Sequence, residues 1–214
     1  MKNIISFIVL ICGVAVILTS CSKDEESTTA ATATSVTTTT PSGSITMGSY
    51  TASGVYLSSC FSGSSVSTLI SAGSLPSDAQ SFGFAFVVTG DDSFTSETHV
   101  FTDTGCATST YISKLVRDNV TVGTASGANY PVTYNDQGFK YTVNTTTAET
   151  WLETLYANVG TTVNMTVGTE KAIPPASTTF TYGLWTPGAT TIYLAAESTS
   201  STPSTAGVIV HTKE

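Results

Sequence analysis

The side chains that could support catalysis or metal binding are few and scattered. The only histidines are His99 and His211. Each lies on the more polar side of a strand-like pattern, which predicts solvent-exposed imidazoles. The densest acidic residues are Asp91, Asp92, Glu97 and Asp103. These carboxylates could bind Ca²⁺, but they lack the regular spacing of a calcium loop and are ordinary residues for a hairpin turn.

No short catalytic motif accompanies these residues. The sequence contains no G-x-S-x-G, H-E-x-x-H, G-x-x-x-x-G-K or C-x-x-C segment. We therefore predict no catalytic residue, no metal site and no cofactor, and a protein that is not an enzyme. A hydrolase is the alternative, and it would require His99 or His211 to be buried beside an acid and a serine.

The N-terminal segment could direct export. Lys2 precedes an almost unbroken apolar run from Ile4 to Leu18. A membrane-spanning helix needs ~20 apolar residues, so this shorter run with small residues after it is typical of a signal peptide. The stretch Leu18-Thr19-Ser20-Cys21 resembles the lipobox of bacterial lipoproteins. The resemblance implies cleavage before Cys21 and its acylation; the alternative is an ordinary signal peptide with a cysteine near its cleavage site.

The residues after Cys21 carry a second targeting pattern. The sequence SKDEE at 22–26 resembles the acidic export signal that sends lipoproteins of Bacteroidetes-type bacteria to the outer face of the outer membrane. It implies a lipid-anchored outer-membrane protein displayed at the surface; a solvated charged leader is the alternative. The Thr-rich stretch that follows lacks aromatic residues and apolar periodicity, which predicts disorder. The predicted organisation is a signal peptide (1–20), a lipidated, disordered tether (21–44) and a β domain (45–214).

The composition limits the possible partners. The formal net charge is −8, only 10% of residues are charged, and lysine and arginine form no cluster. Nucleic acids and anionic membrane surfaces are therefore poor partners, and the expected contact with a membrane is through the lipid on Cys21. The sequence does not indicate an oligomeric state.

Two further cysteines, Cys60 and Cys106, lie in the predicted β domain. An exported protein reaches an oxidising compartment, where a cysteine pair forms a disulfide more readily than it persists as free thiols. Neither residue belongs to a C-x-x-C motif, and no histidine is near Cys60 in sequence. We predict a Cys60–Cys106 disulfide.

From Ile45 onward, apolar and polar residues alternate as in half-buried strands. Three hairpins are predicted, at 81–103, at 130–145 with its turn at 135–138, and at 178–196 with its turn at Pro187-Gly188. Single strands are predicted at 54–60, 65–71, 109–122, 161–167 and 206–212. The aromatic residues expected to face inward include Phe82, Phe84, Phe86, Tyr141, Phe180 and Tyr182. About ten short strands in succession indicate a barrel or a sandwich.

One segment has a helical period instead. Thr146-x-x-Glu149 is a capping box, and Gly160 can end the helix. Between them, one face carries Trp151, Leu152, Leu155 and Tyr156. The pattern predicts a single helix near 147–158, packed against the sheet or over an open barrel end.

Three stretches resemble lipocalin-like barrels. Gly54-Val55-Tyr56 is similar to their Gly-x-Trp opening, with tyrosine in place of tryptophan. VFTDTGC at 100–106 resembles a segment of lipocalin-like domains in bacterial lipoproteins, and 182–198 is similar to their late hairpin. The resemblance implies an antiparallel barrel that binds a lipid or another small apolar molecule. The predicted helix precedes the last strands, whereas in lipocalins it follows the barrel, so no ligand residue is carried over.

The sequence therefore predicts an all-β domain, a lipocalin-like antiparallel barrel of about 8–10 strands with one short helix. The expected function is that of a membrane-anchored lipoprotein that binds a small hydrophobic ligand or a partner. The six inward aromatic residues are candidate ligand-lining residues, or plain core if the interior is filled. The alternative is a structural or adhesive β-sandwich at the cell surface without a small ligand. Pairing of the first and last strands would distinguish a closed barrel from a sandwich.

Overall fold

The structure, a computed structural model, describes residues 32–175 and 179–214. The predicted signal peptide, Cys21 and the acidic segment lie outside the described residues. Neither helix of the described part is long and apolar enough to span a bilayer. The helices are α3 (Ser64–Ser71) and α4 (Thr146–Ala157); the strands are β1 (Ile45–Met47), β2 (Tyr50–Ala52), β3 (Val55–Leu57), β4 (Phe61–Ser62), β5 (Ser81–Val88), β6 (Phe94–Phe101), β7 (Ser109–Val122), β8 (Tyr130–Val143), β9 (Glu170–Ile173), β10 (Thr179–Pro187), β11 (Thr191–Leu194) and β12 (Val210–Lys213).

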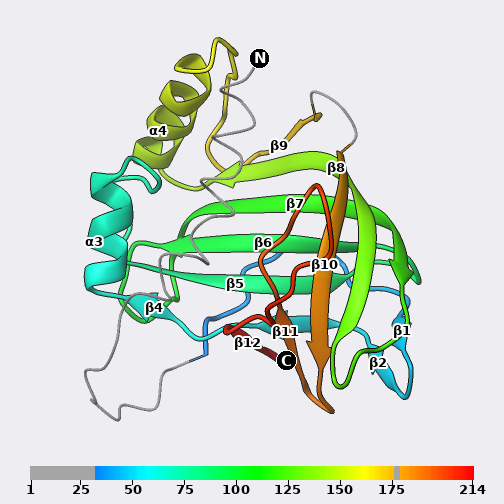
Figure 1. Cartoon of the computed structure of the whole chain (residues 1–214). Helices are drawn as coiled ribbons and strands as arrows, with labels where there is room; N and C mark the ends of the chain where they lie inside the picture. Colours follow the sequence, from blue (N-terminus) through cyan, green and yellow to red (C-terminus); the bar gives the residue numbers. More distant parts are fainter. Residues whose placement is uncertain (1–31, 176–178) are drawn as a thin grey trace.

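Eight strands form a closed antiparallel barrel in the order β3, β5, β6, β7, β8, β10, β11 and β12 (Figure 1). Strand β10 returns beside β8, with Gly183 opposite Val132. The last strand, β12, lies beside the first barrel strand, β3, with Thr212 opposite Leu57. This pairing leaves no free edge between the first and last strands, so the predicted barrel is confirmed and the sandwich alternative is wrong.

The predicted hairpin at 81–103 is formed by β5 and β6, with Val88 opposite Phe94. Alternation along β5 directs Phe82, Phe84 and Phe86 into the barrel, where they join clusters with residues of other strands. The intervening Ala85 belongs to a separate cluster on the outer face. The period of two in the sequence thus assigned both faces of this strand correctly.

The second predicted hairpin is wrong. Residues 130–143 form one continuous strand, β8, which pairs with β7 along its length. Where a turn was expected at 135–138, the register shifts between Val116 and Arg117 on the facing strand. Gly138 has φ 106° there, a conformation that glycine adopts without strain. The turn-like residues therefore make a β-bulge, which bends the long strand without ending it.

The third hairpin exists as β10 and β11, but the inward face predicted for β10 is wrong. Thr181 and Gly183 lie opposite Tyr134 and Val132, whose side chains are buried inside the barrel. The outward positions therefore include Phe180, which is 49% exposed. Because side chains alternate with period two, a shift of one residue moves every predicted side chain to the opposite face.

The helix predicted near 147–158 is confirmed as α4, although its N-cap is Thr145, whose hydroxyl accepts a hydrogen bond from the Ala148 amide at 3.2 Å. A second helix, α3, occupies 64–71, where a strand was predicted. It ends at Gly73 (φ 73°), and the Ser74 amide donates to the Leu69 carbonyl at 2.8 Å. The two residues complete a Schellman motif, and Gly73 at its C′ position was the signal for a helix end that the sequence contained. The strand predicted at 161–167 does not form.

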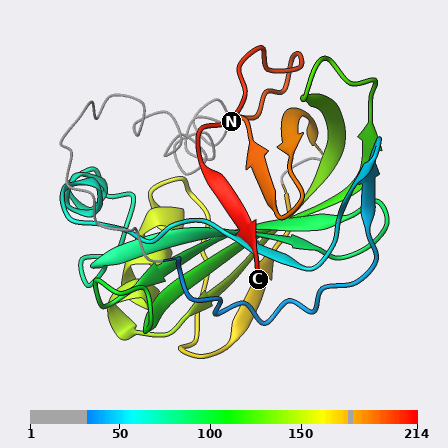
Figure 2. The ribbon, with the colours of Figure 1, turned by 90° about the horizontal axis from the view of Figure 1, so that it is seen from below.

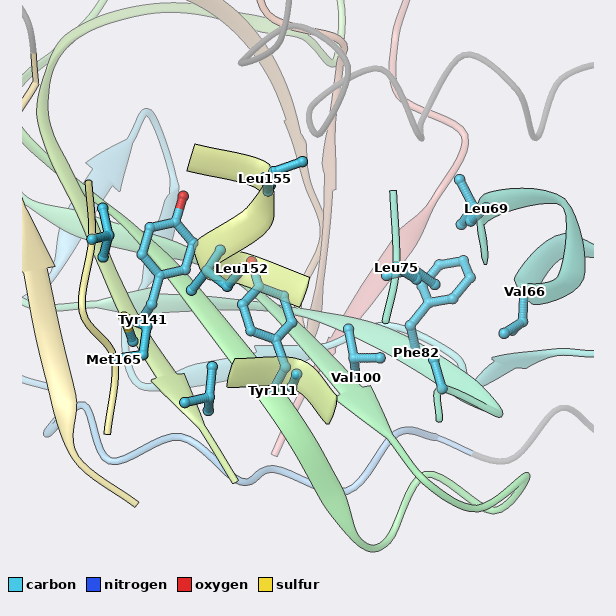
Figure 3. Packing of buried hydrophobic residues seen from close by; sticks show 14 residues of the cluster. Val66, Leu69, Leu75, Phe82, Val100, Tyr111, Tyr141, Leu152, Leu155 and Met165 are labelled. Atoms are coloured by element: carbon cyan, nitrogen blue, oxygen red, sulfur yellow. The ribbon is translucent and has the colours of Figure 1, made fainter. Parts of the chain in front are cut away.

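The two helices lie at the same end of the barrel and close it with apolar side chains (Figures 1 and 3). Leu152 and Leu155 of α4 pack near Tyr111 and Tyr141 of the sheet. Val66 and Leu69 of α3 face Phe82. The indole N–H of Trp151 donates to the Gly73 carbonyl at 3.0 Å and so links α4 to the end of α3. The predicted face of α4 therefore packs over a barrel end.

Residues 32–44, predicted to be disordered, lie along the outer face of the barrel instead (Figure 2). We call this segment the strap. The Ala33 amide donates to the Ser58 carbonyl at 3.1 Å, and the Ser42 amide donates to the Val88 carbonyl at 3.0 Å. A Cβ atom at Gly83 would lie 2.5 Å from the Ala33 Cβ, so glycine there permits the close approach. The prediction of disorder was wrong for this segment because its hydrogen-bond partners in the barrel are remote in sequence.

The predicted disulfide between Cys60 and Cys106 is confirmed, with the Cα atoms 5.9 Å apart. It connects the β3–β4 region to the segment between β6 and β7. Beside it, the Thr34 amide of the strap donates to the Cys106 carbonyl at 3.3 Å. The disulfide therefore also stabilises one of the surfaces on which the strap lies.

Candidate ligand cavity

A cavity of about 140 Å³ lies inside the barrel, between the sheet β5–β8 and the segment that connects β11 to β12. Alternate residues of neighbouring strands converge on it, since Ser96 lies opposite Leu115 and Thr98 lies opposite Ser113. Its lining includes Phe84, Ser96, Thr98, Ser113, Leu115, Arg117, Phe139, Leu194, Ala195, Ala196, Glu197, Ile209 and His211. The cavity is thus mostly apolar, with a few polar groups at defined places.

Arg117 on β7 is the central polar group of the wall and is only 1% exposed. Its Nε donates to Asp136 Oδ1 at 2.9 Å, and its Nη2 donates to Glu197 Oε2 at 2.5 Å. Its Nη1 donates to Ser96 Oγ at 2.5 Å. The guanidinium also lies over the ring of Tyr134, 5.1 Å from the centroid. A buried guanidinium needs such partners, because an unpaired charge is costly to bury.

The Arg117 network places two carboxylates against one cation. Burial raises the pKa of the Glu197 carboxyl, Arg117 opposes this rise, and Asp136 adds to it. Burial also raises the pKa of Tyr134 well above its usual value, and the charge of Glu197 adds to the effect. The phenol of Tyr134 therefore stays protonated at neutral pH, and the carboxylates are in excess in this part of the barrel.

His211 on β12 lines another side of the cavity and is 5% exposed, so the prediction of an exposed imidazole is wrong. It faces inward because it lies opposite Ile192, a residue of the interior cluster. Burial lowers the pKa of His211 to about 4, although backbone hydrogen bonds with Ile192 and Ile209 oppose this. The imidazole is therefore neutral at pH 7. Its Nδ1 atom has no hydrogen-bond partner among the described residues.

A second, smaller void of about 20 Å³ lies toward the helical end. It shares Phe84, Thr98 and Ser113 with the larger cavity. Trp151 of α4 and Leu69 of α3 form its far side. A void of this size holds about one water molecule, so the helical end is effectively filled and the larger cavity is the candidate site.

The six predicted lining residues occupy different surroundings. Phe84 lines the larger cavity, and Phe82 lines the small void. Phe86 packs in the aromatic cluster at the other barrel end, with its ring 5.3 Å from that of Trp185. Tyr141 packs against α4 and accepts a hydrogen bond from the Tyr156 hydroxyl at 3.0 Å. Phe180 and Tyr182 lie on the outer side of β10 with their rings 5.1 Å apart.

The other histidine is also buried, contrary to the prediction. His99 has no exposed surface, and its Nε2 lies 2.7 Å from Glu97 Oε2. The pair sits on the outer face of β6 under the strap, where Thr37 and Thr39 donate to Glu97 Oε1 at 2.8 and 2.7 Å. No serine hydroxyl contacts either imidazole within residues 32–175 and 179–214. The acid and histidine of a triad are thus adjacent in one case, but no serine of the described residues is hydrogen-bonded to that histidine.

Sequence reasoning missed Arg117, Asp136 and Glu197 as a unit. One signal was present, since Arg117 follows Ser113 and Leu115 at spacing two on the predicted strand 109–122 and so falls on an inward face. A charge at such a position requires a buried partner. Across the described ranges, no group of three or more His, Cys, Asp or Glu side chains could hold a metal ion.

Comparison with known proteins provides no assignment. The sequence matches no protein-family model, and no curated protein is significantly similar to it. The closed eight-stranded barrel with its buried aromatic core is compatible with a lipocalin-like fold. The barrel and the residues that line its cavity are therefore the features that bear on function.

Proposed function

We propose that this protein is a bacterial lipoprotein whose barrel binds a small hydrophobic ligand in the interior cavity. The observation that carries the proposal is the 140 Å³ cavity itself, whose walls include Phe84, Leu115 and Phe139. Apolar cavities of about 150 Å³ bind benzene-sized molecules, so the volume suits a small ring or a short branched chain. A long acyl chain would not fit without movement of the wall.

The cavity proposal predicts that toluene binds saturably. Ligand at ten times its Kd adds about 1.4 kcal/mol to the free energy of unfolding, which for a chain of this size raises the Tm by about 3–6 °C. Ser113→Phe should abolish this shift, because the new ring occupies the cavity that Ser113 lines. Thermal denaturation with and without toluene measures both results.

The matched control is Thr212→Phe, which adds the same ring at an exposed position of β12. This variant should keep the toluene shift. The proposal fails if folded wild-type protein shows no saturable shift, or if folded Ser113→Phe keeps the full shift. Failure would favour the alternative of an adhesive protein without a small ligand. The aromatic pair Phe180 and Tyr182 on the outer side of β10 would then be the candidate contact surface.

The location is a separate proposal and rests on the sequence Leu18-Thr19-Ser20-Cys21 and the acidic residues after it. We expect an outer-membrane protein held by acyl chains on Cys21. Two or more chains anchor a protein firmly, whereas a single chain binds only marginally. Cys21→Ala should abolish incorporation of labelled palmitate in cells and release the protein from the membrane fraction. Cys12→Ala is the matched control and should label normally, and labelling of Cys21→Ala would refute the anchor.

A further inference from the structure

Acidic side chains outnumber basic ones around the cavity, and this imbalance affects which ligand charge the cavity can accept. Arg117 is the one cation among the residues described as lining it, and each of its three guanidinium nitrogens already donates to Asp136, Glu197 or Ser96. Two carboxyl groups pair with one guanidinium, so acidic side chains outnumber cationic ones in this region. A ligand carboxylate would have to displace Glu197 from Arg117 or lie beside it, and like charges brought together in this way repel strongly.

Glu197 is the member of the network that a ligand can reach. Its side chain is 27% exposed, whereas that of Arg117 is 1% exposed. Glu197 lines the cavity from the segment between β11 and β12, which lies opposite the long sheet. One of its oxygens, Oε2, accepts from Arg117, and a carboxylate has further acceptor capacity on both oxygens. A donor group on a ligand could therefore bind Glu197 while the ion pair with Arg117 stays intact.

His211 provides an independent observation of the same kind. The imidazole of His211 lines the cavity, and its Nδ1 atom is buried there. This Nδ1 has no partner in the described part of the chain, and in the tautomer that carries its hydrogen on Nε2 it is a lone-pair acceptor. An unpaired buried acceptor in a cavity wall favours a ligand that brings a donor.

From these two features we infer that the cavity selects a small amine in its ammonium form, with a ring or short apolar body, over neutral and anionic molecules of the same size. The ammonium group would donate to Glu197 and to His211 Nδ1. The apolar body would lie against Phe84, Leu115 and Phe139. This inference rests on the proposed ligand-binding function and adds the charge of the ligand to it.

Three probes of nearly equal size test the inference, namely benzylamine, benzyl alcohol and benzoate, titrated at pH 7 by isothermal calorimetry and NMR. Benzylamine should bind at least about tenfold more tightly than benzoate, with benzyl alcohol between them. Glu197→Gln should weaken benzylamine about tenfold and leave benzyl alcohol nearly unchanged. The amide oxygen can still accept from Arg117, which favours retention of the fold.

Glu170→Gln is the matched control, since Glu170 also forms an ion pair, with Lys114, but lies on β9 outside the cavity. It should leave all three affinities unchanged. Equal binding of the three probes, or tighter binding of benzoate, refutes the inference while the cavity function stands. Binding of toluene without benzylamine refutes it as well. If neither toluene nor any of the three binds, the proposed function fails with it.

Discussion

Arg117→Met is expected to lower the free energy of unfolding by about 3–5 kcal/mol, the usual cost of removing one partner from a buried ion pair. The substitution keeps an unbranched side chain at the site but leaves Asp136 and Glu197 without their cation. It also removes the guanidinium from above the rings of Phe94 and Tyr134. Urea denaturation at pH 7 measures the effect.

Two further variants separate the loss of charge pairing from the loss of packing. Lys140→Met removes an exposed lysine whose Nζ lies 3.8 Å from Glu170, and it should cost no more than about 1 kcal/mol. The triple variant Arg117→Met, Asp136→Leu, Glu197→Leu removes the whole network and should recover much of the lost stability, because apolar replacements of buried ion groups are often neutral or stabilising. A loss below about 1 kcal/mol in Arg117→Met would contradict a buried network.

Glu97→Ala is expected to cost a similar amount, about 3–5 kcal/mol, for a related reason. The carboxylate accepts from Thr37 and Thr39 of the strap, from Thr95 and from His99, and all of these donors would lose their acceptor. The strap should also loosen. Hydrogen exchange should therefore accelerate at the Thr34 and Ser42 amides, which donate to the barrel.

The pH dependence of this loss has a defined sign. Burial would raise the pKa of Glu97, but the hydrogen bond and charge of His99, with the bonds from Thr39 and Thr37, outweigh burial and lower it below 4.5. A lowered folded-state pKa contributes stability that is present above the unfolded value and is lost as the pH falls through the folded value. The stability difference between wild type and Glu97→Ala should therefore shrink below about pH 4.5.

The comparison variant is Asp92→Ala, at an exposed turn between β5 and β6, which should change stability by about 0.5 kcal/mol or less. Faster exchange in the strap of Asp92→Ala, or unchanged exchange in Glu97→Ala, would show that Glu97 does not hold the strap. A stability difference that grows as the pH falls would contradict the sign of the pKa shift.

Several elements could be predicted because their signals are local. The alternation of Phe82, Phe84 and Phe86 identified both the strand β5 and its inner face, since the side-chain period is a property of the strand itself. The helical period around Leu152 and Leu155 located α4 to within one residue at each end. The disulfide followed from the number of cysteines left in a chain that is predicted to be exported.

Other predictions were wrong where a partner that is remote in sequence determines the local conformation or the strand register. Asp136 and Gly138 were interpreted as a turn, but in the barrel they form a bulge in which Asp136 binds Arg117. Phe180 was expected inside, but the register of β10 on β8 turns it outward. A strand has two equivalent faces until its neighbour fixes the register, so sequence period alone cannot choose between them.

The sequence by itself determined the class of the domain, its main strands and α4, the disulfide, and the pattern that predicts export and acylation. Only the tertiary structure decided which polar residues are buried. His99 lies on the outer face of β6, where the strap covers it. His211 lies on the inner face of β12, inside the barrel. The physical reason is that a polar residue is buried when distant donors and acceptors compensate its desolvation, as Thr37 does for Glu97 across 60 positions of sequence.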